Sequence, residues 1–262
     1  MPLKHRLKII LLILLWLVIV VKTPAAIYLP LTLFGIYVLY IVWPRFDLTP
    51  SVSLKDKERT IALTFDDGPT PGFTDKILDI LKTTSATATF FMLGQKIEKN
   101  SELAKKVLLS GNEIGGHTYA HKKLHFLNYE EIDNEISKTQ ELIKAIYAAT
   151  GNKENFKNIF RAPHGFKSFT LKKYLRDKGI ALIPWTKGVW DTALPGEHHI
   201  YKEATRSPSN VEILLLHDGH EPADDVLAAL PKIIDFYKNN GYKFVKVSEL
   251  IKGEHNVGGY PK

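Results

Sequence analysis

The sequence contains no cysteine, which excludes disulfide bonds and thiolate metal ligands. Any metal must therefore be bound by His, Asp or Glu. Internal repeats and low-complexity tracts are absent as well. With 45% hydrophobic and 24% charged residues among 262, the composition is that of a globular chain. Outside the apolar N-terminus about 210 residues remain, enough for one domain with a substantial core.

Concentrated basic charge is also lacking outside the N-terminus. The formal net charge is +7, but residues 1–50 hold five basic residues and one acid, which is +4 of the total. The other 30 basic and 27 acidic residues give only +3. A nucleic-acid-binding domain gathers basic charge on its folded surface. The distribution therefore indicates a membrane-associated terminus and no nucleic-acid partner.

Long apolar runs occur at the N-terminus. Residues 9–21 are thirteen consecutive apolar residues, and residues 25–43 carry no charge. The second run is long enough to cross a bilayer, which takes about 20 residues, whereas the first is short and resembles a signal-peptide core. Neither run has the polar face of a soluble helix. We expect a membrane anchor of one or two segments and a linker in residues 1–50, and a catalytic domain in residues 51–262.

After the linker, strand-like and helix-like patterns alternate. This order is typical of an α/β fold with a parallel sheet, either open or closed into a barrel. Ligands of such folds bind at the carboxyl ends of the strands. The expected strands are Thr60–Phe65, Ala86–Leu93, Glu113–Ile114, a segment at Phe160, Ile180–Trp185 and Val211–Leu216, and the expected helices are Thr74–Lys82, Glu102–Leu109, Tyr129–Tyr147, Leu171–Asp177 and Val226–Asn239.

Two of these strand ends carry residues suited to a metal. Asp66 and Asp67 follow the first strand, and adjacent carboxylates stay ionised together only when a cation or base neutralises one of them. An Asx-turn or a helix cap is the alternative interpretation. His117 and His121 follow the third strand four residues apart, on one face if that turn is helical. These two histidines and one of the two carboxylates would make a metal site with positions open for water and substrate.

Three further strand ends carry polar residues. Arg161 and His164 follow Phe160, and His217 ends the apolar run from Val211. Asp191 lies just beyond the strand expected to end at Trp185. A single histidine after a buried strand is usually a core or capping residue. Here all the candidate site residues follow the carboxyl ends of expected strands. A purely structural role for each residue would not explain why they share this location.

The ordered segments resemble the five motifs of the NodB-homology polysaccharide deacetylases, carbohydrate esterase family 4. The resemblance covers roughly residues 56–251, and the first two motifs are the most specific. The corresponding segments are Thr64-Phe65-Asp66-Asp67-Gly68-Pro69, His117-Thr118-Tyr119-Ala120-His121, Arg161-Ala162-Pro163-His164-Gly165, the Trp190-Asp191 region and Leu216-His217.

This resemblance implies a distorted (β/α) barrel with fewer than eight regular strands, and hydrolysis of the N-acetyl group of an amino sugar. In the family the first Asp, here Asp66, is the catalytic base, and the last His, here His217, is the acid. The second Asp and both His, here Asp67, His117 and His121, bind the metal. The sequence departs from the family at His164, where a Tyr is usual. It also departs in the fourth motif, which usually carries a second Asp and a following Trp, whereas here Asp191 is followed by Thr192.

The expected chemistry fits these residues. A divalent metal ion, Zn²⁺ or alternatively Co²⁺, would acidify a bound water and polarise the acyl oxygen. Arg161 would hold Asp66 ionised, and Asp191 would keep His217 protonated. The backbone N–H of His164 would stabilise the oxyanion. Aromatic side chains that could stack on a sugar, or belong to the core, are Trp185, Trp190, Tyr119 and Phe166.

The expected substrate is an acetylated amino-sugar polymer resembling peptidoglycan, chitin or poly-N-acetylglucosamine. Three alternatives remain: a deacylase or deformylase of a lipid-linked amino sugar, an O-acetyl esterase, and a catalytically inactive carbohydrate-binding module. Positive charge at Lys4, Arg6 and Lys8 favours a cytoplasmic N-terminus. Two spans would return the domain to the cytoplasm, whereas a single anchor would place it outside, where cell-wall polymers are. The substrate favours an extracytoplasmic domain.

Overall fold

The computed structural model describes residues 30–37, 58–193, 196–219 and 224–251. The chain divides into two units, Met1–Thr49 and Pro50–Lys262. In the first unit, residues 30–37 are helical. No helix in the described ranges is both long enough and apolar enough to cross a bilayer. The predicted apolar segment 9–21 lies outside these ranges, and segment 25–43 lies only partly inside them.

An eight-stranded sheet forms the centre of the second unit, in the order β5-β4-β3-β2-β1-β7-β6, with β8 paired to β1. Every pairing is parallel. The strands are β1 (Thr60–Asp66), β2 (Ala88–Met92), β3 (Glu113–Gly116), β4 (Ile159–Phe160), β5 (Ala181–Leu182), β6 (Lys187–Gly188), β7 (Val211–His217) and β8 (Lys243–Phe244). The predicted α/β class and parallel sheet are confirmed.

Strand β1 lies at the centre because its side chains are apolar or small on both faces. Six of its seven residues are buried, as are the first six of β7 beside it. Burial on both faces produces a continuous apolar run rather than an alternating one. The register pairs Asp66 directly with His217, so the last residues of β1 and β7 lie side by side.

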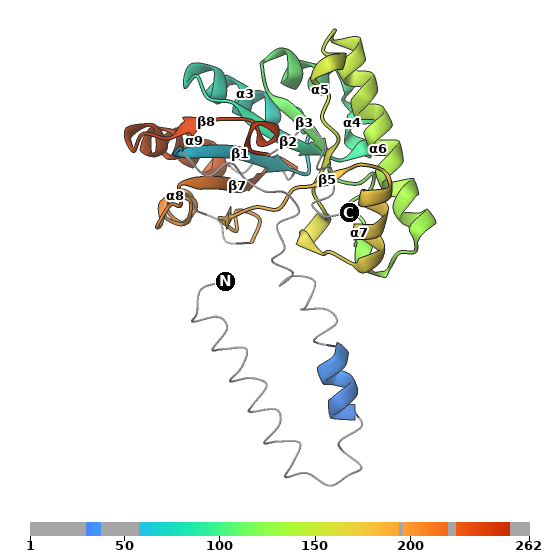
Figure 1. Cartoon of the computed structure of the whole chain (residues 1–262). Coiled ribbons are helices and arrows are strands. Elements are labelled where there is room, and N and C mark those ends of the chain that lie inside the picture. Colours follow the sequence, from blue (N-terminus) through green and yellow to red (C-terminus); the bar gives the residue numbers. More distant parts are fainter. Residues whose placement is uncertain (1–29, 38–57, 194–195, 220–223, 252–262) are drawn as a thin grey trace. The chain divides into compact units, whose positions relative to one another are not determined.

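Helices lie around the outside of the curved sheet (Figure 1). Helix α6 begins at a capping box in which Asn128 and Glu131 bond each other's backbone N–H groups, and Ser168 caps the first turn of α7. The helices are α3 (Thr74–Thr83), α4 (Gly94–Lys99), α5 (Ser101–Leu109), α6 (Tyr129–Ala149), α7 (Phe169–Asp177), α8 (Glu197–Thr205), α9 (Asp224–Asn239) and α10 (Val247–Leu250).

The sheet ends at β5 and β6, which do not pair with each other in the described residues, so it forms a half-barrel rather than a closed barrel. The strand predicted at Ile180–Trp185 is reduced to two residues. Pro184 has no N–H to donate to a ladder, and the carbonyl oxygens of Ile183 and Pro184 accept from the Arg161 guanidinium. The short strands β6 and β8 and the helices α4, α8 and α10 were not predicted.

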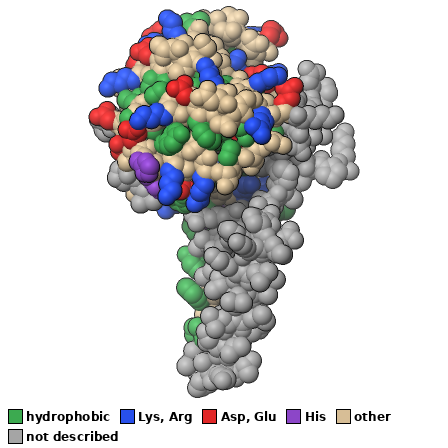
Figure 2. Space-filling view, turned by 90° about the vertical axis from the view of Figure 1, so that its left-hand side faces the viewer, with side chains coloured by type: hydrophobic (Ala, Val, Ile, Leu, Met, Phe, Trp, Pro, Cys, Tyr) green, Lys and Arg blue, Asp and Glu red, His purple; other side chains and the backbone are tan. Residues whose placement is uncertain are grey.

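Acidic and basic side chains are intermingled over the face of the second unit shown in Figure 2. Ion pairs at the surface of the described residues include the one between Lys105 and Glu102. Such pairs contribute little to stability. Stability comes mainly from the apolar core, whose largest cluster packs one face of β1 against the helices through residues such as Phe65, Ile77 and Leu230.

Candidate metal and catalytic site

The carboxyl edge of the sheet brings the predicted site residues together. Asp66 ends β1 and His217 ends β7. His117 directly follows β3, and Arg161 directly follows β4. Each is buried or nearly so at this edge. Parallel strands therefore place side chains that are far apart in the sequence within one cluster.

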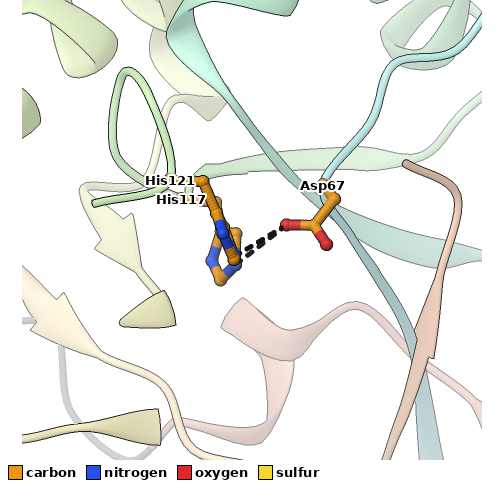
Figure 3. Close-up of side chains that lie close together, drawn as sticks. All are labelled: Asp67, His117 and His121. Carbon is orange, nitrogen blue, oxygen red and sulfur yellow. Dashed lines mark ion pairs between the residues drawn. The ribbon is translucent and has the colours of Figure 1, made fainter. Parts of the chain in front are cut away.

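Asp67, His117 and His121 form a group that could hold a metal ion (Figure 3). The Oδ1 atom of Asp67 lies 3.3 Å from the Nε2 of His117 and 3.2 Å from the Nε2 of His121. Both imidazole rings therefore point the same nitrogen at one carboxylate oxygen. Two His nitrogens and a carboxylate oxygen are a donor set that Zn²⁺ and similar divalent ions prefer.

The hydrogen bond on the far side of His117 fixes how its ring can bind a metal. Its Nδ1 lies 2.8 Å from the backbone oxygen of Arg161. A carbonyl oxygen only accepts, so Nδ1 carries the proton and donates. In the neutral ring, the lone pair of Nε2 then faces the Asp67 carboxylate, and a cation between these two acceptors would satisfy both. This outer bond is the usual way in which metal-binding histidines are oriented.

The charge states of the group suit a cation. Burial alone would raise the pKa of Asp67, but the hydrogen bond and the positive charge that His117 and His121 provide when they are protonated hold that pKa well below its usual range. Burial lowers the pKa of His121 despite the attraction of Asp67. The group thus offers an ionised carboxylate and a neutral His121, which are the forms that bind metals.

Backbone strain gathers at this site. Asp67, Thr118, His121, His164 and Trp190 all have φ between 58° and 76°, a left-handed region that residues other than glycine rarely occupy. The segment from His117 to His121 is therefore a loop, so the condition of a helical turn, under which both rings would lie on one face, is not met. Left-handed residues in the loop bring the two Nε2 atoms together instead.

Asp66 lies beside the metal group but is held by a different partner. Its Oδ1 accepts from Arg161 at 2.8 Å, and its Oδ2 is 3.8 Å from the Nε2 of His117. Arg161 is 1% exposed and also donates to the hydroxyl of Thr64 and to two backbone carbonyls. Arginine therefore fixes one oxygen of Asp66 and leaves the other directed toward the metal group.

The network around Arg161 predicts that even a conservative change is damaging. Arg161→Lys removes the planar fork and leaves the Asp66 carboxylate and two carbonyls short of donors. We expect the free energy of unfolding to fall by about 3 kcal/mol, because several buried acceptors lose their donors at about 1 kcal/mol or more each. Urea denaturation of Arg161→Lys and of the exposed control Arg59→Lys measures this, and equal midpoints for both variants would contradict it.

His217 forms a tight pair with Asp191. The carboxylate accepts from the backbone N–H of His217 at 2.8 Å through one oxygen and bonds its Nδ1 at 2.8 Å through the other. Burial opposes protonation of the ring, but this hydrogen bond and the charges of Asp191, Asp66 and Asp67 outweigh it and raise the pKa of His217 to about 9. His217 is thus protonated at neutral pH, and Nε2 is the ring nitrogen that Asp191 does not bond.

The pair gives a pH prediction with a definite sign. An acid acts while it is protonated, so activity is present below its pKa and is lost as the pH rises through that value. Asp191→Asn removes the charge that raises the pKa of His217. The alkaline limb of the kcat/KM profile should therefore move down by about one to two pH units. Profiles from pH 6 to 10 for Asp191→Asn and for the exposed control Asp235→Asn test this, and an unmoved limb would contradict it.

His164 and the aromatic candidates have different surroundings. The ring of His164 lies edge-on to His121 with centroids 4.9 Å apart, so His164 borders the metal group. Phe166 is buried, and Trp185 packs against Gly165. The ring of Tyr119 lies under the Nζ of Lys138 at 3.7 Å. Among the four predicted stacking residues, only Trp190 is largely exposed.

Three supporting residues had no role assigned from the sequence. A Cβ at Gly219 would lie 2.0 Å from the Cβ of Asp67, so the loop after β7 packs directly on a metal-site residue. Asp218 is fully buried and accepts from the hydroxyl of Thr74 at 2.6 Å. Lys96 donates to the carbonyl of Gly219. The sequence did offer a pattern that pointed to this loop. An Asp-Gly pair follows the last residue of two strands, Asp67-Gly68 after β1 and Asp218-Gly219 after β7.

Comparisons with known proteins agree with this geometry. A family model described as polysaccharide deacetylase matches residues 53–183. A peptidoglycan-N-acetylglucosamine deacetylase of Bacillus cereus is 35% identical over 202 residues, covering 76% of this chain and 92% of the relative. A chitooligosaccharide deacetylase of Azorhizobium caulinodans is 30% identical over 175 residues, covering 67% of this chain and 81% of that protein.

A solved structure is similar in fold as well as in sequence. It is the Bc1960 peptidoglycan N-acetylglucosamine deacetylase, which superposes with a TM-score of 0.71 at 29% identity. The superposition covers 78% of this chain and 92% of that one. The chain therefore belongs to the polysaccharide deacetylase family and is an enzyme that hydrolyses amide bonds.

Proposed function

We propose that this enzyme is a metal-dependent N-deacetylase of an acetylated amino-sugar polymer. The observation that supports this best is the convergence of three elements at one edge of the sheet. They are the metal-binding group, the Asp66–Arg161 pair and the His217–Asp191 pair. A base, an acid and a Lewis-acid site together are what hydrolysis of an unreactive amide requires.

The metal would be held by Asp67, His117 and His121, with Zn²⁺ favoured by the nitrogen-rich donor set and Co²⁺ as an alternative. When bound, a divalent ion supplies a Lewis acid that polarises the acyl oxygen and acidifies water. Hydrogen bonds from the protein keep the donors in place. The Nδ1 of His117 donates to the Arg161 carbonyl, and the backbone N–H of His121 donates to the hydroxyl of Thr118.

The protein's own groups move the protons. Asp66, with Oδ1 held by Arg161, would accept a proton from the attacking water through Oδ2. His217 would donate the proton on Nε2 to the leaving nitrogen while Asp191 stabilises the charged ring. The backbone N–H of His164 would donate to the developing oxyanion, an interaction of a kind that contributes about 3 kcal/mol. The products are a free amine on the sugar and acetate.

The relatives bear on the substrate. One is named for N-acetylglucosamine in peptidoglycan and another for chitooligosaccharides. We infer that this enzyme takes the N-acetyl group from a glucosamine unit of such a polymer. Acetate release from purified peptidoglycan and from chitopentaose, each compared with Asp66→Asn, tests this. Release from neither substrate would contradict the proposal, and turnover of an O-acetylated glycan alone would favour the esterase alternative. No predicted catalytic position holds an inert side chain, which disfavours an inactive binding module.

The location of the enzyme is a further part of the proposal. The apolar segments at residues 9–21 and 25–43 support a membrane anchor, and the basic residues before them support a cytoplasmic N-terminus. A polymeric substrate then favours a domain on the outer side. A reporter active only outside the cytoplasm, fused after Lys262, should give a signal. A signal from a cytoplasmic reporter instead would reverse the topology and favour a lipid-linked sugar as substrate.

A further inference from the structure

Trp190 exposes its side chain between two buried neighbours. Its exposed fraction is 67%, whereas Val189 is 0% exposed and the side chain of Asp191 is 2% exposed. Val189 belongs to the main core, and Asp191 is bonded to His217. The backbone on both sides of Trp190 is therefore fixed, and the indole is presented to solvent from a rigid position.

The backbone of Trp190 is also strained. Its φ is 60°, a value that is a clear outlier for a bulky residue and that glycine would adopt without cost. The carbonyl oxygen of Trp190 accepts from the N–H of Ala193 at 2.9 Å, which holds the turn in this shape. A strained position that carries a large exposed ring points to a role for that ring outside the core.

Single exposed aromatic residues are common on protein surfaces and need no explanation by themselves. Phe126 and Phe169 are exposed to 62% and 85%, but neither has a left-handed backbone. Trp190 differs from both because it is strained and directly precedes the residue that orients His217. Its location ties the indole to the catalytic edge of the sheet.

The position of Trp190 also decides which part of a substrate it can meet. Of the two groups that would transfer protons, Asp66 is 3% exposed and the side chain of His217 is 21% exposed. The acetamide must therefore approach side chains that are mostly buried, whereas the indole of Trp190 is exposed to solvent. While the acetamide lies at Asp66, Trp190 would contact a neighbouring part of the same substrate molecule. In a glycan that part is the adjacent sugar.

We propose that Trp190 is a stacking platform for the sugar ring next to the one being deacetylated. The C–H groups on one face of a pyranose carry partial positive charge and complement the negative face of an aromatic ring. This proposal rests on the proposed function and narrows its substrate class to chains of two or more sugars. Trp190 would thus favour longer sugar chains as substrates and take no part in the chemistry at the amide.

Two variants of the full chain test the proposal. Trp190→Gly removes the ring and suits the left-handed backbone, and Trp190→Phe keeps an aromatic face. Leu109→Ala is the matched control, because Leu109 is 68% exposed at the end of α5, before β3, and so lies at the opposite edge of the sheet. Each protein is assayed on chitopentaose and on a small aryl acetate, and thermal unfolding is recorded.

The ratio of kcat/KM for chitopentaose to that for the aryl acetate should fall by about tenfold or more in Trp190→Gly. It should recover most of its value in Trp190→Phe and stay unchanged in Leu109→Ala. The unfolding midpoint of Trp190→Gly should be equal to or above that of the parent, which separates loss of binding from loss of fold. An unchanged ratio in Trp190→Gly would overturn the proposal.

Binding to the metal-free protein separates this proposal from the proposed function. Chitopentaose binding to chelator-treated enzyme is measured by calorimetry. Binding that weakens in Trp190→Gly supports the platform even if no acetate is ever released, in which case only the proposed function fails. Acetate release with equal pentamer affinity in both proteins would leave the function intact and overturn the platform.

Discussion

Asp66→Asn is expected to lower kcat by about a thousandfold while the bound metal is retained. Asn has nearly the shape of Asp but cannot accept a proton, and general-base catalysis contributes about 10² to 10⁴ in rate. Asp66 lies outside the metal-binding group. Its Oδ2 is 3.8 Å from the Nε2 of His117, and its Oδ1 accepts a hydrogen bond from Arg161. The KM for a polymeric substrate should change little, since the lost interaction belongs to the chemical step.

The measurement combines steady-state kinetics with metal analysis of the purified variant. Asp79→Asn, an exposed substitution on α3, is the matched control and should behave as the parent does. A variant at Asp66 that purified without metal would show that Asp66 is a ligand. One that retained metal and full turnover would show that another group is the base.

Loss of His121 should have an equally large effect for a different reason. His121→Ala removes one of the three proposed metal ligands, so affinity for Zn²⁺ should fall by at least about a hundredfold. Loss of a residue that only hydrogen-bonds a metal ligand lowers the affinity less. Activity should disappear at ordinary Zn²⁺ concentrations and return partly when Zn²⁺ is in large excess. The parent treated with a chelator should lose activity in the same way and recover with Zn²⁺ or Co²⁺.

The control for this experiment is His198→Ala, which removes an exposed histidine of α8. Zinc titration by calorimetry gives the affinities independently of turnover. Equal affinities for the parent and His121→Ala would remove His121 from the metal site. Turnover that persisted in His121→Ala with excess chelator would contradict a metal-dependent mechanism altogether.

The central strands and the placement of the site could be predicted from the sequence, because both depend on local patterns. Strands β1 and β7 are mostly apolar runs that end in polar residues, a pattern that burial on both faces of a sheet favours. Once two parallel strands are predicted, Asp66 and His217 must lie at the same edge. The structure adds that they are direct register partners.

Features that depend on contacts between distant segments could not be predicted. The two-residue strands β6 and β8 carry too few residues for any periodicity, and each forms beside a longer strand, β7 or β1. The loop at His117–His121 takes a non-helical shape that no residue pattern specifies. Likewise, the close packing of Gly219 on Asp67 joins segments that are far apart in the chain, so the role of the Asp218 loop emerged only from the fold.

The central claim is that Asp67, His117 and His121 hold the metal on which hydrolysis depends. Anomalous scattering from crystals of the zinc-loaded protein, recorded on both sides of the zinc absorption edge, tests it most directly. The predicted result is one strong peak within coordination distance of an Asp67 carboxylate oxygen and the Nε2 atoms of His117 and His121, at about 2.0 to 2.2 Å from each. A peak bound by other side chains, or no peak in a zinc-loaded and active enzyme, would contradict the claim.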